Sequence, residues 1–436
     1  GWGWNGVIKY YKKLETDTDY GDDPRHGDSG PISIRRHKRA DWPGFCDAIA
    51  SELHRRGYGY VKDMNVEPRD GVCSVALSST QGLRQSTAIS YLTADVRARP
   101  NLDIRSDCFA ERLVFDGTRC TGVQIRSNGE TETLNADEII VSGGSLQSPA
   151  LLMRSGIGPA AHLKEHGIDI VANRAGVGQN LHEHPTCILA AHLRYNGMQN
   201  AGLRAAGNAA LRHSSRLEGC PPHDFYTAIA NKVSWHPLGT RIGGAIVAVV
   251  KPYSRGAVTL KSADPSINPR VAFHVMEDAR DMARMKMGLR LFFEIFRSPA
   301  VRAVTTEAFP AAFSARVREL NWETRANWWK SFAGSLLMDL PGPFRRAALR
   351  TLIAPGPTLD DIFATDETLE SWIRENCRGF FHPVGTCRFG EASDPMGVVD
   401  PAGRVHGVQG LRVVDASVMP AITRANTNLT AIMIGE

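Results

Sequence analysis

A histidine close to the end of the chain stands in a context that suits proton transfer. His382 follows Phe381 and precedes Pro383, whose ring limits the local backbone. An imidazole has a pKa of about 6.5, so it can take a proton from a substrate near neutral pH. Further along, Asn426 offers an amide that both donates and accepts hydrogen bonds. We predict that His382 and Asn426 face one another over a cofactor.

A carboxylate follows residues 411–414, a mainly apolar run with one arginine, which we interpret as a strand. The run ends abruptly at Asp415, and Ala416 comes next. The edge just past the ends of buried strands is where α/β sheets hold ligands, so Asp415 is a further candidate. Asn426, Thr427 and Asn428 then open a segment, residues 429–434, with the composition of a buried helix.

A strand that runs into a glycine pair adds a possible phosphate-approach element. Residues 138–141 suit a strand with three apolar residues after Glu138, Gly143 and Gly144 follow, and residues 145–154 suit a helix. A hydrolase nucleophile is disfavoured here, because Gln147 stands where Gly-x-Ser-x-Gly requires its last glycine after Ser145. Ser29, in Gly-Asp-Ser-Gly-Pro, resembles the trypsin-like nucleophile motif but lacks its second glycine.

Size and composition exclude several classes of protein. The 436 residues allow two or three domains, and the net charge of +5 is mild. The basic cluster at residues 35–39 lacks interleaved aromatics, which indicates a solvated face and no nucleic-acid partner. No apolar run approaches the roughly 20 residues that span a bilayer, so we expect no transmembrane segment.

The cysteines and two further histidines bear on metals and location. The eight cysteines contain no Cys-x-x-Cys pair, which argues against a zinc site and favours a reducing compartment, so we expect a cytoplasmic protein. His182 and His184, two residues apart, would share one face of a strand. Without an evident third ligand we interpret both as structural and expect no metal site.

Periodicity gives a coarse outline of the elements. Helices are predicted at residues 42–56 and 278–297, the second with an apolar stripe of core residues. A meander of strands is predicted at 101–105, 110–115 and 121–126, and an antiparallel sheet at 243–251, 257–261 and 270–274. Residues 186–235 show little clear period, and residues 300–370 suggest helices and loops.

Taken in order along the chain, the motifs resemble the glucose–methanol–choline (GMC) family of flavin-dependent oxidoreductases. The most specific stretch is residues 144–159, which is similar to the family's second signature over its whole length. The others are Gly1-Trp2-Gly3-Trp4, His26-Gly27 with Gly30-Pro31, Asp63-Met64-Asn65, Arg97 with Arg99-Pro100-Asn101-Leu102, residues 176–185, Pro252 with Ser254-Arg255-Gly256, and the His382 and Asp415 motifs.

The resemblance implies an α/β (overall α+β) fold. An incomplete FAD-binding Rossmann-like domain would be joined to a substrate domain with an antiparallel sheet backed by helices. It assigns residues 1–185 to the FAD-binding region, with substrate-side loops at 1–90, residues 186–376 to the substrate domain, and residues 377–436 to the return into the FAD-binding domain. The strand and Gly-x-Gly-x-x-Gly turn with which the family opens are not matched, so the chain resembles a fragment.

The resemblance also implies roles for single residues. His382 would be the catalytic base and Asn426 its orienting partner. Cofactor contacts would come from Ala110, through its backbone to the adenine, from Asp415 and Ala416 near the phosphate and ribityl region, and from Thr427 and Asn428 at the ring. Phe381 would form a wall of the substrate pocket.

The predicted function is FAD-dependent oxidation of an alcohol to an aldehyde or ketone, by proton abstraction and hydride transfer to flavin N5. The electron acceptor would be oxygen or a quinone, and the pattern is closer to choline- and aryl-alcohol-type members than to sugar oxidases. The alternatives are a flavin-free remnant or half of a split enzyme, inactive alone, and a serine hydrolase using Ser29 or Ser145.

Overall fold

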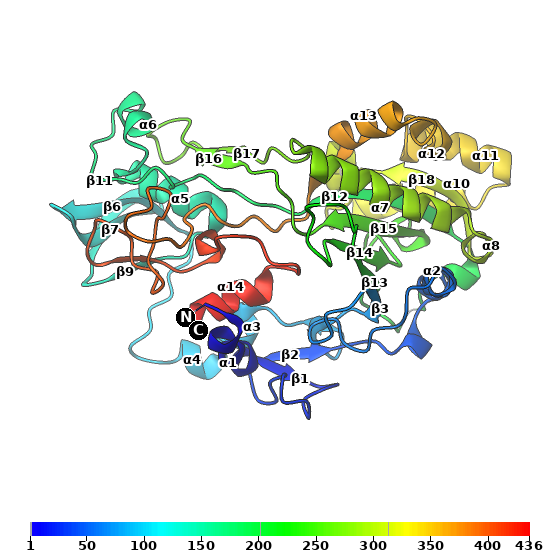
Figure 1. Ribbon diagram of the computed structural model, residues 1–436, viewed down its shortest axis with the longest axis horizontal. Helices are drawn as coiled ribbons and strands as arrows, with labels where there is room; N and C mark the ends of the chain where they lie inside the picture. Colours follow the sequence, from blue (N-terminus) through cyan, green and yellow to red (C-terminus); the bar gives the residue numbers. More distant parts are fainter. Residues whose placement is uncertain (1, 201, 313) are drawn as a thin grey trace.

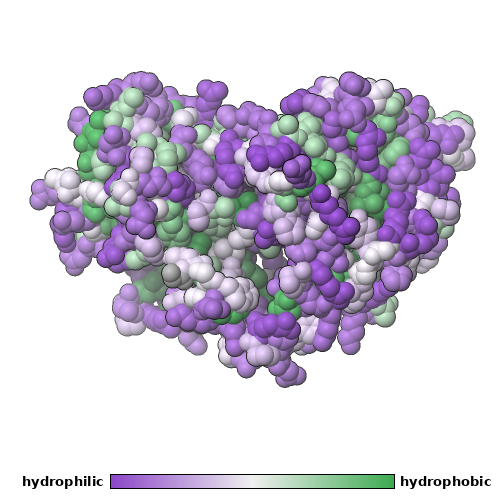
Figure 2. Space-filling view, viewed as in Figure 1, coloured by the Kyte–Doolittle hydropathy of each residue, from purple (hydrophilic) through white to green (hydrophobic). Residues whose placement is uncertain are grey.

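The structure is a computed structural model that describes residues 2–200, 202–312 and 314–436. Two lobes stand above a shared lower layer, in which the two ends of the chain come together (Figure 1). The space-filling outline is notched at its upper edge between the lobes (Figure 2). Helices and sheets are mixed throughout, which confirms the predicted α/β class.

One lobe is built on a seven-stranded antiparallel sheet in the order β18-β12-β15-β14-β13-β3, with β19 extending β12. Helices α2 and α7 pack on it, α13 packs on α7, and the predicted stripe of α7, including Met285, Leu289 and Phe292, lies in the core. The elements are β3 (Gly71–Ser74), β12 (Pro185–Leu193), β13 (Gly207–His213), β14 (Phe225–Ala230), β15 (Ile242–Val249), β18 (Thr305–Ala311), β19 (Arg378–Gly379), α2 (Gly44–Arg55), α7 (Ala279–Arg297) and α13 (Asp366–Asn376).

Three strands of this sheet fall where the sequence shows no clear period. Strands β12 and β13 are buried almost along their whole length and β14 has no exposed residue, so their side chains do not alternate between apolar and polar. The strands predicted near 257–261 and 270–274 do form, as β16 (Ala257–Thr259) and β17 (Arg270–Ala272). They were wrongly assigned to one sheet with β15, because they make a separate hairpin.

The other lobe holds a meander and a small parallel sheet. Strands β6 (Cys108–Asp116), β7 (Arg119–Ser127) and β8 (Glu130–Asn135) form the meander, and β9 (Ile139–Val141) pairs with β20 (Leu411–Val413) beside helix α5 (Gly144–Arg154). The strand predicted at 101–105 is wrong, because that segment is exposed and forms no strand. The third strand of the meander is β8 instead.

The lower layer joins the ends of the chain. Helix α1 (Trp4–Leu14) packs on α14 (Asn428–Gly435), the predicted C-terminal helix, and the Tyr11 hydroxyl lies 2.8 Å from that of Thr430. No helix in the described ranges has both the length and the apolar character to cross a bilayer. The remaining elements are β1 (Glu15–Asp17), β2 (Ile32–Arg35), β4 (Leu77–Thr80), β5 (Leu83–Arg84), β10 (Ile157–Gly158), β11 (Ala172–Asn173), α3 (Thr87–Ser90), α4 (Ala94–Arg97), α6 (Ala160–Glu165), α8 (Pro299–Arg302), α9 (Ala315–Leu320), α10 (Arg325–Met338), α11 (Gly342–Ala348) and α12 (Leu359–Ile362).

Candidate active site

The pairing of two antiparallel segments brings two histidines to one place. Strand β12 begins directly after His184 and pairs with β19, so that Pro185 lies opposite Gly379. A second bridge joins His182 to Val384. Between these two pairings the first segment, residues 182–185, advances by three residues, whereas the second, residues 379–384, advances by five. The second segment therefore bulges just before His382.

Glu183 holds this bulge in place. Phe381 has a φ of +62°, a left-handed conformation that is uncommon for a bulky residue. The Glu183 carboxylate accepts hydrogen bonds from the backbone N–H groups on either side, those of Phe380 (3.2 Å) and His382 (2.9 Å). Burial raises the pKa of Glu183 to about 7, although these backbone donors act in the opposite direction.

The aromatic residues near His382 have different positions. The side chain of Phe381, the predicted pocket wall, is 78% exposed. The ring of Phe380 instead packs against the imidazole of His382, with 5.0 Å between the ring centroids.

His382 and Asn426 lie together, as the sequence predicts. The amide Nδ2 of Asn426 is 3.1 Å from Nε2 of His382, and His382 is buried whereas Asn426 is exposed. On its other side, His382 Nδ1 is 2.9 Å from Nδ1 of His184. His184 was predicted to be structural, and its contact with His382 was not foreseen. The sequence feature that could have indicated this contact is the spacing of His182 and His184, two residues apart and directly before Pro185.

The hydrogen bonds fix the tautomers of both histidines. Burial, and then the neighbouring His382, lower the pKa of His184 to about 3, and burial lowers that of His382 to about 4, so both rings are neutral at pH 7. Nε2 of His184 is 2.9 Å from the Thr423 carbonyl, which only accepts, so this nitrogen carries the hydrogen. Nδ1 of His184 therefore accepts from Nδ1–H of His382. The lone pair of His382 is left at Nε2, facing Asn426.

One cation, Lys251, acts on His184 and has two further cations near it. Lys251 donates to the backbone carbonyl of Ile422, and burial, with help from Arg424 and Arg255, lowers its pKa to about 8. The same Lys251 and Arg255 act with burial to lower the pKa of His182 to about 3. Lys251 also contributes to the lowered pKa of His184, whereas burial alone lowers that of His382.

Asp415 braces the chain at the end of β20. Its carboxylate accepts hydrogen bonds from the Gly144 N–H (2.8 Å), the Ser148 hydroxyl (2.5 Å) and the Ser417 N–H (2.7 Å). It thus occupies the N-terminus of α5, the end that the glycine pair suggested for a phosphate. Ala416 follows Asp415 and is half-buried.

The other predicted cofactor residues lie on two separate elements. Thr427 and Asn428 stand at the N-terminus of α14, where the Thr427 side chain makes no capping hydrogen bond. Ala110 lies in β6 opposite Ile125, packed against the core of its lobe.

The serines of the hydrolase alternative lack a base. Ser145 Oγ is buried without a hydrogen-bond partner, and no histidine of the described residues hydrogen-bonds to Ser29 or Ser145. A serine nucleophile needs such a base within about 3 Å. Nothing in the structure supports the hydrolase interpretation.

One group of side chains has the spacing of a metal site. Glu15, Asp17 and His26 bring their ligand atoms within 4.8 Å of one another. The Arg36 guanidinium already binds Asp17 (2.8 Å) and Asp63 (2.8 Å) beside them. The positive charge of Arg36 therefore already offsets the negative charges of Asp17 and Asp63.

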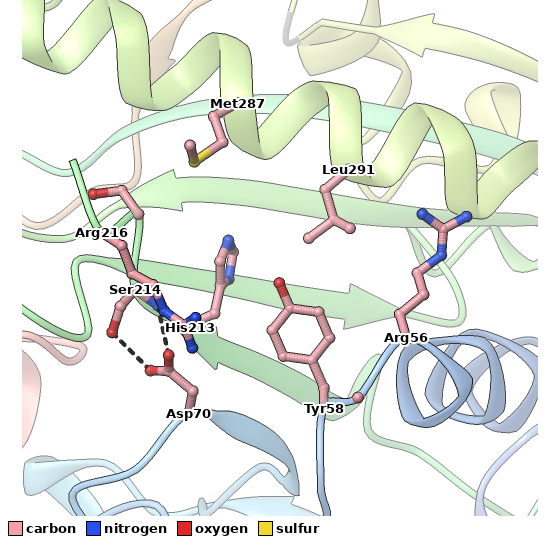
Figure 3. A pocket seen from close by; sticks show the side chains of 10 residues that line it. Arg56, Tyr58, Asp70, His213, Ser214, Arg216, Met287 and Leu291 are labelled. Carbon is pink, nitrogen blue, oxygen red and sulfur yellow. Dashed lines mark hydrogen bonds between the residues drawn. The ribbon is translucent and has the colours of Figure 1, made fainter.

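A cavity of about 420 Å³ opens elsewhere, at the edge of the large sheet beneath α7 (Figure 3). Asp70 at its floor is engaged by the Ser214 backbone (3.1 Å) and hydroxyl (2.9 Å), and the His213 ring stacks on Phe225. Neither His382 nor Asn426 lines it. This cavity is separate from the histidine pair.

Comparisons with known proteins place the chain in a family. Residues 1–186 and 252–435 match the N- and C-terminal sequence models of the GMC oxidoreductase family. The chain is 37% identical to the 5-(hydroxymethyl)furfural oxidase of Methylovorus sp., over 100% of its own length and 75% of that protein. It is 33% identical to the oxygen-dependent choline dehydrogenase of Brucella ovis, over 100% of the chain and 74% of that protein.

Solved structures share the fold. Pyridoxine 4-oxidase from Mesorbium loti superposes with a TM-score of 0.78 at 21% identity, covering 99% of this chain and 76% of that one. A formate oxidase variant of Aspergillus oryzae superposes with a TM-score of 0.79 at 22% identity, covering 100% and 77%.

The fold and these relatives define the class of protein as an FAD-dependent oxidoreductase that acts on alcohols. Within that class, the chain belongs to the GMC oxidoreductase family.

Features around α14 and β9 fit FAD. The backbone amides of the first turn of α14 have no side-chain cap, which suits a group that carries negative charge. Helix α14 is apolar in composition, yet Met433 is its one buried residue among those described. Strand β9 pairs with β20 alone within the described residues, and Ile140 is 56% exposed. A large cofactor with an apolar ring and anionic groups matches this combination.

Proposed function

We propose that His382 is the catalytic base and Asn426 its orienting partner in the oxidation of an alcohol to an aldehyde or ketone. The observation that carries this proposal is the chain of hydrogen bonds from Thr423 through His184 and His382 to Asn426. It leaves an unprotonated nitrogen, Nε2 of His382, beside an exposed amide that can hold a hydroxyl oxygen.

In the proposed reaction the substrate hydroxyl takes the position between His382 and Asn426. Nε2 of His382 accepts the hydroxyl proton, while the Asn426 amide donates to the oxygen. The Nδ1–H of His382 stays on His184, so the imidazole keeps its orientation as it becomes charged. FAD, when bound, supplies the acceptor for the hydride from the adjacent carbon, at N5 of its ring.

We assign the cofactor contacts as the sequence predicts. Thr427 and Asn428 would contact the flavin ring, and the Ala110 backbone the adenine. Asp415 and Ala416 would lie near the ribityl and phosphate groups, and the hydrogen bonds of Asp415 would hold that segment in place. In this proposal residues 1–185 and 377–436 form the FAD-binding region, and residues 186–376 form the substrate domain.

The substrate class follows from charge. Lys251 acts on His184, and Arg255 and Arg424 act on Lys251, so a cationic substrate such as choline would be repelled on its way to the site. An uncharged hydroxymethyl compound, like the one in the name of the Methylovorus relative, suits this environment better. The electron acceptor is oxygen or a quinone. We propose a cytoplasmic location, with the eight free cysteines in its support.

The test is the visible spectrum of the purified protein under anaerobic conditions. A yellow protein that bleaches with 5-(hydroxymethyl)furfural, and much more slowly with choline, agrees with the proposal. A colourless protein would instead favour the flavin-free remnant. His382→Ala should lower the bleaching rate by about 10²- to 10⁴-fold with flavin still bound. His192→Ala, which removes another buried histidine with a lowered pKa, should bleach normally. Normal bleaching in the His382 variant contradicts the assigned base.

A further inference from the structure

Helix α10 turns its apolar side away from the protein. Trp329 is 63% exposed and Leu336 is 50% exposed, and Trp328 and Phe332 stand on the same face at helical spacing. The residues buried on the opposite face are mostly small and polar: Asn327, Ser331, Ser335 and Met338. A helix on the surface of a globular protein normally shows the reverse arrangement.

Hydrogen bonds lock α10 in this orientation. The Asn327 amide donates to the backbone carbonyl of Glu319 (2.7 Å). The Ser331 hydroxyl donates to His236 Nδ1 (2.5 Å) and accepts from the Leu238 N–H (2.8 Å). A rotation of the helix that buried its tryptophans would break these bonds, so the outward apolar face is built into the fold.

Three of the exposed apolar residues of α10 form a cluster. The rings of Trp328, Trp329 and Phe332 contact one another, with centroids 4.8 to 5.8 Å apart. Leu340 follows α10, and Phe344 in α11 is 66% exposed. Helix α11 lies at the outer right-hand end of the molecule, whereas α14 lies near its middle (Figure 1). We refer to Trp328, Trp329, Phe332, Leu336, Leu340 and Phe344 as the α10–α11 face.

Positive charge is concentrated in the segment of the chain that carries this face. Residues 314–353 contain seven basic and three acidic residues, so this segment accounts for four of the five net positive charges of the chain. One of the acids, Asp339, is paired with Arg241. Acids outside the segment offset part of this charge, because Glu307 pairs with Arg345 and Arg346 and Asp361 interacts with Arg350, whereas Arg325 and Lys330 have no ion pair among the described residues. The basic side chains are Arg316, Arg318, Arg325, Lys330, Arg345, Arg346 and Arg350.

We propose that the α10–α11 face binds an anionic phospholipid surface. Aromatic side chains flanked by arginine and lysine are the usual composition of helices that lie in the interface of a bilayer. A second copy of the chain fits less well, because a twofold dimer through this face would oppose two positively charged surfaces. The proposal does not depend on the proposed reaction.

The experiment is sedimentation of the purified protein with vesicles. Vesicles of phosphatidylcholine alone are compared with vesicles of equal parts phosphatidylcholine and phosphatidylglycerol, at low and at high salt. The protein should pellet with the anionic vesicles at low salt and be released at high salt. Trp329→Ser combined with Phe332→Ser should weaken binding by at least about tenfold. Tyr195→Ser, at a side chain 93% exposed on another element, is the matched control and should bind normally.

Light scattering without vesicles completes the test, and thermal melting shows that each variant is folded. Failure to pellet with anionic vesicles at low salt overturns the proposal, and so does equal binding by the Trp329/Phe332 double variant. A dimer that the double variant dissociates, without binding to vesicles, identifies a second copy as the occupant and also overturns it.

Discussion

At the scale of single residues, His184 gives His382 its direction. The Thr423 carbonyl fixes the hydrogen of His184 at Nε2, and this in turn fixes the hydrogen of His382 at Nδ1. Without an acceptor at His184 Nδ1, His382 could carry its hydrogen at either nitrogen. Only one of these two tautomers leaves Nε2 unprotonated and able to act as the base. His184 is therefore a positioning residue in the proposed reaction.

Substitutions at His184 should separate its two hydrogen bonds. His184→Asn keeps an acceptor near the position of Nδ1, so turnover should fall by less than about tenfold. His184→Leu removes the acceptor and should lower kcat by about 10- to 100-fold with little change in KM. Nitrogen NMR of the labelled protein should show Nε2 of His382 unprotonated in the wild type and partly protonated in the leucine variant. An unprotonated Nε2 and full turnover in that variant would contradict the assignment.

The buried position of His382 predicts an unusual pH profile. Burial lowers its pKa to about 4, and a base acts in its unprotonated form, so the rate should persist into acid. At pH 5.5 about 97% of a base with this pKa is unprotonated, against about 9% for an ordinary histidine of pKa 6.5. We expect kcat/KM, measured in brief assays before acid inactivation, to stay level from pH 7 to about 5. A break near pH 6.5 would show that His382 is not the base or is not buried in solution.

At the scale of elements, Asp415 joins the end of β20 to the start of α5. Its three hydrogen bonds reach Gly144 and Ser148 on one side and Ser417 on the other, across about 270 residues of sequence. Because all three partners are donors, the site is specific for a full carboxylate.

The isosteric change Asp415→Asn tests this brace. The asparagine NH₂ group would face a backbone N–H or a hydroxyl hydrogen, leaving buried donors unpaired, so we expect a loss of about 2–4 kcal/mol in the free energy of unfolding. Urea denaturation measures it. Asp169→Asn, at an exposed aspartate, should change stability by less than about 0.5 kcal/mol. Equal effects of the two substitutions would deny Asp415 its structural role.

The sequence predicts elements well where burial is one-sided and poorly where it is not. Helix α7 shows its buried stripe, and the turns at Gly117 and Gly129 require a positive φ, so both were found. Strands β12 to β14 were missed because both of their faces are buried. The approach of His382 to Asn426 followed from motif context, whereas the contact with His184 depends on a bulge two residues long that no local pattern encodes.

At the scale of the whole molecule, buried neutral histidines occur in more than one place. Burial lowers the pKa to between about 3 and about 4 for His182, His184, His192, His213 and His382. At mildly acid pH each of these rings binds a proton in the unfolded chain but stays unprotonated in the folded chain. Their contributions to stability therefore have the same sign and the same pH window, although they serve different local structures.

The resulting prediction is a steep loss of stability on mild acidification. From pH 6.5 to 5.5, each histidine with an unfolded pKa of 6.5 and a folded pKa near 4 or below should remove about 1 kcal/mol, or about 5 kcal/mol for the five together. Glu183 acts in the opposite direction, because its pKa is raised to about 7 in the folded state and it gains its proton there first. Over the same pH range it should increase the free energy of unfolding by about 1 kcal/mol. Urea unfolding at the two pH values measures the difference. His192→Asn should reduce that difference by about 1 kcal/mol, whereas His274→Asn, at an exposed side chain, should leave it unchanged. A difference below about 1 kcal/mol in the wild-type protein would mean that these histidines are hydrated in the folded state, His382 among them.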